Sequence, residues 1–443
     1  MQLDRRNFLS ASGLALVVGA TSTRALAALG PARSTADLST WAGVRAQFDL
    51  APGWLHFSQF FIVSHPRPVR EAIERYRREL DASPFATVER GMGFGDPNVE
   101  TLPMAVQKAA AAYVGGRPEE IALTDSTTQG LALVYNGLTL GPGQEVLTTT
   151  HDHYVHHESI RLACERSGAT WRRVALYDAP QTASVDEMTS RLKSAIAPRT
   201  RVVGLTWVHS STGVKVPIQA LTAVVADANR GRDAKDRILV VLDAVHGFGN
   251  QDLDLAASGC DFAAAGTHKW IFAPRGTGII WAAARNWPLV RPTIPTFYAN
   301  DPISAWMNGR TASGGTQASW VSPGGFKAYE HQWAMADAFA FHQQIGRKRL
   351  ADRIAALNSM CKEGLAKIPR LTVLTPRDPA LSAGIIAFEI EGRAPKEIVE
   401  RLRARKVVAS TSPYKQTRAR LSPSLVNDEH EVEAAVKAVR EIA

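Results

Sequence analysis

The stretch RVVGLTWVHSSTGVKVPIQALTAVVADANRGRDAKDRILVVLD, residues 201–243, contains two short apolar runs with one helical pattern between them. The runs at 201–208 and 238–243 are rich in β-branched residues and too short for helices, so each predicts a buried strand. Between them, residues 218–229 have the apolar spacing of a helix. A strand–helix–strand unit of this kind predicts two parallel strands in one sheet.

The same alternation continues on both sides of this unit. Further apolar runs predict strands at 121–123, 145–149, 170–175, 262–265 and 278–282. Amphipathic spacing predicts helices at 69–80, 101–113, 129–136, 157–167 and 185–195. We therefore expect an α/β fold whose mainly parallel sheet is wound by helices on both faces.

Beyond residue 330 the pattern changes. Two long helical stretches come first, and they are followed by strand-like runs at 371–374, 384–390 and 407–410 and by helices at 395–405 and from residue 428. This order predicts a smaller α+β domain at 326–443, after a large domain at 61–325. An irregular segment at 288–323, too long for a plain connector, separates them.

Composition restricts the class of protein. The 443 residues are 45% hydrophobic and 21% charged, as in a globular enzyme. The net charge of +9 is spread over helix faces rather than concentrated in blocks, so we do not expect nucleic-acid binding. Three widely spaced cysteines imply no disulfide framework.

The N-terminus has the parts of an export signal. Arg5 and Arg6 precede an apolar run at 11–20, and Ala25-Leu26-Ala27 offers a small-x-small cleavage site. Paired arginines are typical of the twin-arginine route, which exports folded proteins. We expect residues 1–27 to be removed, residues 28–60 to form a linker or arm, and the mature protein to be periplasmic. No other stretch reaches the ~20 apolar residues of a membrane span.

Asp243 and Lys269 suggest a cofactor. Ligands of open α/β sheets bind at the carboxyl ends of the strands, where Asp243 lies. Lys269 stands among apolar and glycine neighbours, which should lower its pKa and make it nucleophilic. A lysine and a distant carboxylate are what pyridoxal phosphate (PLP) requires, one for its aldehyde and one for its ring nitrogen. A salt-bridged lysine and a helix-capping aspartate would look the same.

A third motif adds a phosphate site. Asp125-Ser126-Thr127-Thr128-Gln129-Gly130 follows a predicted strand and opens a predicted helix. Helix N-termini with hydroxyl side chains bind phosphate, although such a motif alone is also an ordinary helix cap.

Together these motifs carry a family resemblance. Thr127–Gly130, Asp243-Ala244-Val245-His246 and Thr267-His268-Lys269 followed by Gly276-Thr277-Gly278 resemble the class V aminotransferases of PLP fold type I. The resemblance covers roughly residues 50–440 and is greatest to the isopenicillin N epimerase-like branch. Twin-arginine-exported members that act on siderophore peptides in the periplasm are similar in layout and in the segment SHPRPVREAI, residues 64–73.

The resemblance implies roles for individual residues. Lys269 would be the Schiff-base lysine and proton shuttle, and Asp243 the partner of the pyridine nitrogen. The other expected cofactor contacts are His246 at the ring hydroxyl, His153 stacked on the ring with Ser210 beside it, and Thr127, Thr128, His268 and Thr267 at the phosphate. Gly266 stands where relatives often have serine. Arg420 would bind the substrate α-carboxylate, and Thr316 would reach the phosphate of a second subunit, making the active unit a homodimer.

Three competing hypotheses remain at this stage. The spacing H-x-H-x-x-H at His151, His153 and His156, with His157 adjacent, resembles a metallo-hydrolase motif, but Val155 stands where such motifs carry aspartate. A persulfide-forming desulfurase needs a cysteine near the arginine, and there is none between Val407 and Arg420. A PLP-free binding protein would have no use for the lysine, aspartate and arginine together.

We expect an enzyme that acts at the α-carbon of an amino acid, or of a peptide bearing a free amine. Transamination ranks first because it needs no acid or base beyond Lys269. Epimerisation needs a second such group, for which His153, Tyr154 and Tyr414 are candidates, and C–S or C–N elimination shares the early steps. Some aromatic residues could line the pocket or pack in the core: Phe60, Phe61, Trp306, Trp320 and Trp333.

Overall fold

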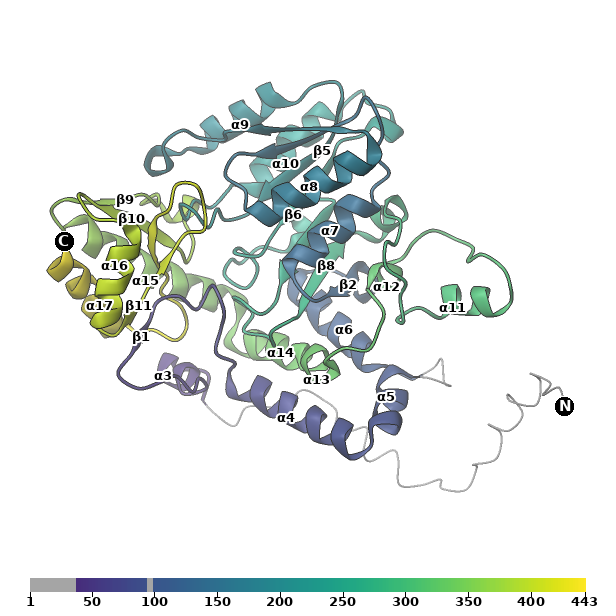
Figure 1. The fold of residues 1–443 in the computed structure, drawn as a ribbon, viewed down its shortest axis with the longest axis horizontal. Helices are drawn as coiled ribbons and strands as arrows, with labels where there is room; N and C mark the ends of the chain where they lie inside the picture. The colour runs from purple at the N-terminus through teal and green to yellow at the C-terminus, as the bar shows by residue number, and fades with distance from the viewer. Residues whose placement is uncertain (1–36, 94–98) are drawn as a thin grey trace.

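The computed structural model describes residues 37–93 and 99–443 (Figure 1). The predicted twin-arginine signal, the cleavage site and the first part of the arm lie outside the described residues. Within the described part of the chain, no helix combines the length and apolar character needed to cross a membrane.

A seven-stranded sheet forms the centre of the large lobe. Its strand order is β2-β8-β7-β6-β5-β3-β4, with bounds Ile121–Thr124, Gly278–Ala282, Phe262–Gly266, Leu239–Asp243, Thr200–Thr206, Glu145–Thr149 and Thr170–Val174. All neighbours are parallel except β8, which runs antiparallel to β7 and β2. The connection from β7 to β8 contains no crossover helix, so a parallel pairing is not available to β8. The predicted mainly parallel sheet is confirmed.

Helices cover both faces of this sheet. They are α6 (Leu102–Val114), α7 (Thr127–Gly137), α8 (Tyr154–Ser167), α9 (Val185–Ala195) and α10 (Ile218–Ala228). Successive residues of β6 belong to opposite cores: Val241 packs with residues of α7 and α8, and Leu242 packs with residues of α6, α9 and α10. Burial on both faces explains why the strands are continuous apolar runs rather than alternating ones.

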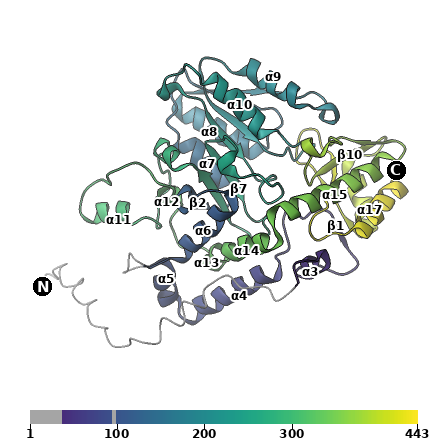
Figure 2. The same cartoon turned by 180° about the vertical axis from the view of Figure 1, so that it is seen from behind.

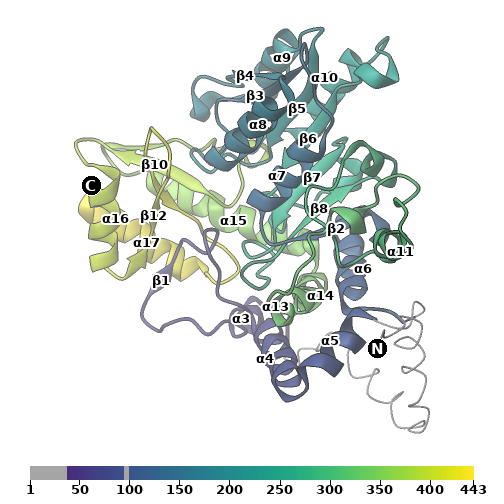
Figure 3. The same cartoon turned by 45° about the vertical axis from the view of Figure 1, so that its right-hand side comes forward.

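The smaller lobe has its own sheet and core. Four antiparallel strands in the order β12-β13-β10-β9 have the bounds Ser410–Thr411, Ala419–Leu421, Ile386–Ile390 and Leu371–Val373. Helices α15 (Arg347–Ala366), α16 (Pro395–Ala404) and α17 (Glu429–Ile442) supply apolar side chains to this core. Figure 3 shows the lobe beside the carboxyl-terminal part of the large sheet.

The N-terminal arm is more structured than a linker. It contains α3 (Trp41–Arg45) and β1 (Leu55–His56), and β1 pairs in parallel with β11 (Val407–Val408). Phe57, directly after β1, is fully buried in the core of the smaller lobe. The sequence could not predict this strand because two residues show no periodicity. The arm leads to α4 (Arg67–Ala82) and α5 (Pro84–Met92).

The segment at 288–323 is also less irregular than its sequence suggested. It contains α11 (Asn300–Met307) and α12 (Ala318–Val321), followed by α13 (Tyr329–Trp333) and α14 (Met335–Ile345). Figure 2 shows α11 on an arm that stands away from the rest of the molecule. Trp306 in α11 is 78% exposed, so the expectation that it packs in the core was wrong for this chain. Trp333 is buried against Tyr76 and Tyr329.

Candidate active site

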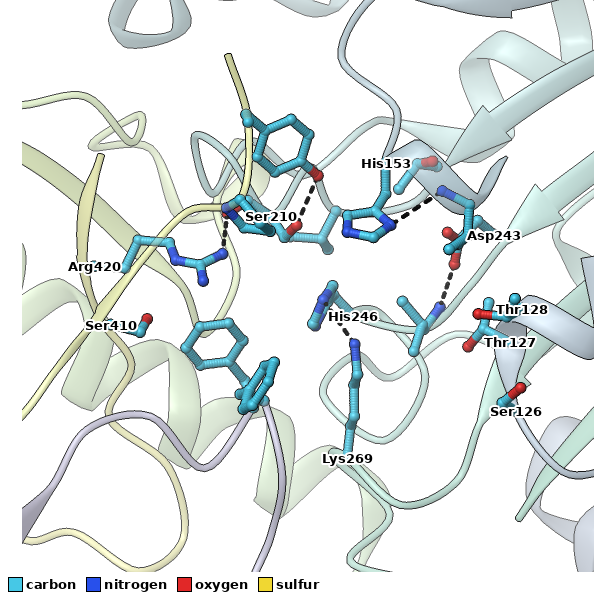
Figure 4. Close-up of a pocket in the computed structure, with 18 of the residues that line it drawn as sticks. Ser126, Thr127, Thr128, His153, Ser210, Asp243, His246, Lys269, Ser410 and Arg420 are labelled. Atoms are coloured by element: carbon cyan, nitrogen blue, oxygen red, sulfur yellow. Dashed lines mark hydrogen bonds between the residues drawn. The ribbon is translucent and has the colours of Figure 1, made fainter. Parts of the chain in front are cut away.

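A cavity of about 480 Å³ lies between the two lobes. Residues at the carboxyl ends of β5, β6 and β7 form one side, and Ser410, Thr411 and Arg420 of the small sheet form part of the other. Figure 4 shows Lys269 and His246 in its middle, Asp243, Ser126, Thr127 and Thr128 toward one end, and Arg420 at the other. This is where ligands of open α/β sheets bind.

Lys269 follows β7 and faces an imidazole. Burial lowers its pKa to about 8, although the carboxylate of Asp243 acts in the opposite direction. Its Nζ lies 3.4 Å from Nε2 of His246. Loss of solvation is thus the main reason why this amine deprotonates more easily than an ordinary lysine.

The proton position on His246 follows from its other neighbour. Trp270 Nε1–H donates to His246 Nδ1 at 3.3 Å, and burial holds the pKa of His246 well below its usual range. A neutral imidazole that accepts at Nδ1 carries its proton on Nε2. This N–H can donate to Lys269 only if the lysine offers a lone pair. The arrangement therefore favours the uncharged, nucleophilic amine.

Asp243 ends β6 with its carboxylate buried. It is 2% exposed, and one oxygen accepts the backbone N–H of Val245 at 3.1 Å. Burial raises its pKa to about 6, and the nearby carboxylate of Asp152 adds to this effect. A cationic N–H in the pocket would stabilise the ionised form and reverse the shift. The carboxylate is thus suited to a protonated ring nitrogen.

Hydroxyl groups surround the N-terminus of α7. Ser126 caps this helix by accepting the N–H of Gln129, and Thr127 Oγ1 accepts the N–H of Gly266 at 2.7 Å. Thr128 is exposed at the pocket wall. His268 lines the same wall and donates through Nδ1 to the Thr277 carbonyl. A helix N-terminus with free hydroxyls can bind a phosphate.

Gly266 keeps this corner open. A Cβ at this position would lie 2.8 Å from Cε1 of His268 and 3.2 Å from Thr127 Oγ1. Packing therefore favours glycine at this position, where the family resemblance implies that serine is frequent. Thr267 does not take over the missing hydroxyl: it is fully buried, bonds Thr277 Oγ1 at 2.6 Å and is not among the residues lining the cavity. For Thr267, the structure does not support the expected phosphate contact.

Thr316 lies elsewhere on this chain. It lines a second cavity, together with Met104, Tyr298 and Gln317, rather than the one that contains Lys269. Its expected contact with the phosphate of a second subunit stays a prediction.

A pair of hydroxyls closes another side of the pocket. Ser210 Oγ and Tyr414 Oη are 2.8 Å apart, and the ring of His153 meets that of Tyr414 edge-on at 5.8 Å. His153 Nδ1 accepts the N–H of Val155, so its neutral ring carries the proton on Nε2. Burial raises the pKa of Tyr414, so its hydroxyl is a donor near neutral pH. Tyr154 is 67% exposed and does not line this cavity.

Arg420 forms the end of the pocket opposite the hydroxyl cluster. It is 3% exposed, and its terminal nitrogens donate to the carbonyls of Ser210 at 2.7 Å and Thr411 at 2.8 Å. The guanidinium lies 4.8 Å from the ring centre of Phe60. Burial lowers its pKa to about 10, which still leaves a cation at neutral pH.

The four neighbouring histidines do not converge on a metal. His151 stacks on Tyr177, His156 bonds Tyr135 and Thr206, and His157 donates to the carbonyl of Thr149. Among residues 37–93 and 99–443, no group of three or more histidine, cysteine or acidic side chains is arranged to hold a metal ion. The metallo-hydrolase hypothesis therefore finds no support in the described part of the chain.

The three cysteines are remote from this chemistry. All are free and buried, and burial raises the pKa of Cys164 to about 11 and those of Cys260 and Cys361 to about 12. None lines the cavity. A thiolate nucleophile beside Lys269 is absent from the described residues of the pocket.

The donor set fits PLP. Thr128 and the N-terminus of α7 suit its phosphate, the buried carboxylate of Asp243 suits a pyridinium nitrogen, and the Lys269 amine suits its aldehyde. All three sites are predicted by the sequence. Two features of the pocket are not evident in the sequence. The ring of Phe60 packs against the Arg420 guanidinium. Ser410 lies beside Arg420 only through the register of β12 with β13.

Comparison with known proteins supports this assignment. The family described as Aminotransferase class-V matches residues 65–414. An isopenicillin N epimerase of Amycolatopsis lactamdurans is 27% identical, over 80% of this chain and 85% of that protein. A cysteine desulfurase of Klebsiella pneumoniae is 24% identical, over 72% of this chain and 75% of that protein.

A solved structure shares the fold. It is a variant of C-DES with glycine covalently linked to its PLP cofactor, and it superposes with a TM-score of 0.79 at 21% identity. The match covers 90% of this chain and 99% of that one.

Proposed function

Since this chain belongs to the class V aminotransferase family and its pocket fits PLP, we propose that it transaminates an α-amino acid, or a peptide with a free amine beside a carboxylate. The observation that carries the proposal is the desolvated amine of Lys269, within reach of the His246 N–H in the same pocket as Asp243. PLP, when bound, supplies an aldehyde for amines and a cationic ring that accepts electrons from the α-carbon.

The side chains that line the pocket would then have separate roles. Asp243 would hold the ring nitrogen protonated, and the hydroxyls at 126–128 would anchor the phosphate end. Once displaced by the substrate amine, Lys269 would be free to accept the α-proton, because its pKa of about 8 suits a base near neutral pH. The same ammonium can return the proton to a neighbouring carbon. No second acid or base is required.

Arg420 supports the choice of a carboxylate substrate. Its buried cation lies at the far end of the pocket from Thr127 and Thr128 (Figure 4). An amine at Lys269 and a carboxylate at Arg420 would orient one α-carbon between them.

Epimerisation is the second candidate. The isopenicillin N epimerase relative favours it, and the Ser210–Tyr414 pair supplies a proton donor in the same pocket. The raised pKa of Tyr414 suits donation but not abstraction. Persulfide-forming desulfuration is disfavoured by the remote, protonated cysteines.

We further propose that the enzyme acts in the periplasm as a homodimer. Arg5, Arg6 and the following apolar run support twin-arginine export. The family resemblance supports a shared site in which Thr316, which lines a different cavity from Lys269 within one chain, reaches a partner's phosphate.

Incubation of the PLP-loaded enzyme with candidate amino acids in deuterated water tests the proposal. Conversion of the cofactor to its pyridoxamine form, with a keto acid as product, is expected for transamination. Deuterium uptake at the α-carbon with mixed chirality and unchanged cofactor would instead indicate epimerisation. If no α-amino acid takes up deuterium or converts the cofactor, the proposal is wrong.

A further inference from the structure

A second polar side chain accompanies Arg420 at the substrate end of the pocket. Ser410 and Arg420 are direct partners in the antiparallel ladder of β12 and β13, so their side chains project from the same face of the sheet. Both line the cavity that contains Lys269. Figure 4 shows them together, on the side away from Thr127 and Thr128.

Both side chains have hydrogen-bonding atoms that are buried but unpartnered. One hydrogen on each terminal nitrogen of Arg420 is used by the carbonyls of Ser210 and Thr411. Its Nε, and Oγ of Ser410, are buried with no partner among the described residues. Buried polar groups in folded proteins are nearly always paired. Two unpaired donors side by side in a pocket wall therefore indicate a ligand that accepts from both.

The chemistry of the two donors selects the ligand. Arg420 brings a buried positive charge, so the acceptor should be an anion. A serine hydroxyl and a guanidinium N–H offer one donor to each of two oxygens, which matches a planar carboxylate. A phosphate, with three oxygens and more charge, is better served by the hydroxyls and helix N-terminus at the opposite end of the cavity.

The family resemblance already implies a substrate carboxylate at Arg420, and we propose that Ser410 Oγ–H donates to the same carboxylate, which makes Ser410 a specificity-determining residue. The inference rests on the proposed function, because it places the α-carboxylate of an amino-acid substrate at this pair. It predicts that Ser410 adds to the preference for amines with a free α-carboxylate over the corresponding esters, amides and simple amines.

Two small oxyamines test this inference without knowledge of the substrate. Aminooxyacetate and methoxyamine both condense with the aldehyde of PLP, but only the first carries a carboxylate. Their rates are measured on the PLP-loaded full-length protein from the change in cofactor absorbance. For Ser410→Ala we expect the preference for aminooxyacetate to fall roughly tenfold or more, because a hydrogen bond to a charged group is lost. The methoxyamine rate should not change.

Two further variants exclude a merely structural effect. Ser410→Thr keeps a hydroxyl and should retain the preference. Ser424→Ala removes another buried, unpartnered serine hydroxyl that does not line the pocket, and it should leave both rates unchanged.

The outcomes separate this inference from the proposed function. If Ser410→Ala leaves the preference intact, or slows both oxyamines equally, Ser410 does not bind the carboxylate, although the proposed function stands. If the unaltered protein gives no cofactor absorbance and no change with either oxyamine, both are overturned.

Discussion

Two buried lysines of this protein share a low pKa but have opposite surroundings. Burial lowers the pKa of Lys269, in the large lobe, and of Lys362, in the smaller lobe, to about 8. Lys362 donates to the carbonyls of Pro376 and Arg377 and to Ser382 Oγ, at 2.6–3.0 Å. Lys269 instead faces the N–H of His246 and lines a cavity.

The difference in surroundings predicts that desolvation alone does not make a lysine reactive. Three oxygens accept the three protons of the Lys362 ammonium, so all the hydrogen bonds of its charged form are made. This lysine therefore links α15 to the loop that follows it. At Lys269 a donor faces the amine, and a ligand-sized space adjoins it. We expect a lysine to act as a nucleophile or base where its ammonium form has no hydrogen-bond acceptors. The following predictions test this contrast.

Lys269→Ala should have the largest effect. It removes both the amine that holds the cofactor aldehyde and the base for the α-proton, so we expect turnover to fall about 10⁴-fold or more. Thermal unfolding of the cofactor-free variant should be nearly unchanged, because Lys269 has few stabilising contacts. Equal losses of turnover for Lys269→Ala and Lys362→Met would remove the distinction between the two lysines.

Asp243→Asn should give the next largest loss. The variant keeps the shape of the carboxylate but not its charge, so the ring nitrogen of PLP is no longer held protonated. Turnover should fall on the order of 100-fold, and PLP should bind more weakly. Stopped-flow absorbance and equilibrium dialysis measure the two quantities. Unaltered turnover would show that Asp243 does not serve the ring nitrogen.

Lys362→Met should affect stability rather than chemistry. It leaves two carbonyls and Ser382 Oγ without their donor, so the free energy of unfolding should fall by about 2 kcal/mol. Denaturant titration measures this change, and PLP absorbance and turnover of the folded variant should remain those of the parent. Loss of the cofactor absorbance in a folded Lys362→Met protein would contradict the account.

The pH dependence of PLP capture should show the smallest effect. Lys269 reacts only when neutral, so the capture rate of cofactor-free protein should rise with pH with a midpoint at about 8, rather than near 10.5. The charge of Arg420 contributes to this lowered pKa, so Arg420→Gln should move the midpoint to higher pH. Arg418→Gln, which alters an ion pair with Glu389 away from the cavity, is the matched control. A midpoint that does not differ between the two variants would exclude Arg420 as a cause.

The same contrast explains what the sequence could predict. The sequence predicts Asp243 and Thr127–Thr128 because they lie at or just after the ends of strands, and the carboxyl ends of parallel strands meet at one edge. It predicts Lys269 because the neighbours of this lysine are apolar residues and glycines. Lys362 is one residue in an amphipathic helix, and nothing local separates it from a surface lysine.

Other features depended on tertiary contacts. Strand β1 pairs with β11, and Ser410 with Arg420, through strands too short to show a periodic pattern. The hydrogen bond between the Thr267 and Thr277 side chains likewise has no signal in the sequence. The tautomer of His246 depends on Trp270, a neighbour whose indole had no evident role in the sequence.

Borohydride reduction followed by peptide mass mapping would show which lysine of this protein binds PLP. The reagent fixes PLP to whichever lysine holds its aldehyde. We expect a single pyridoxyl group on the peptide that contains Lys269, and none on the peptide that contains Lys362. A pyridoxyl group on Lys362 or another lysine, or no modification of a PLP-treated protein, would contradict this expectation.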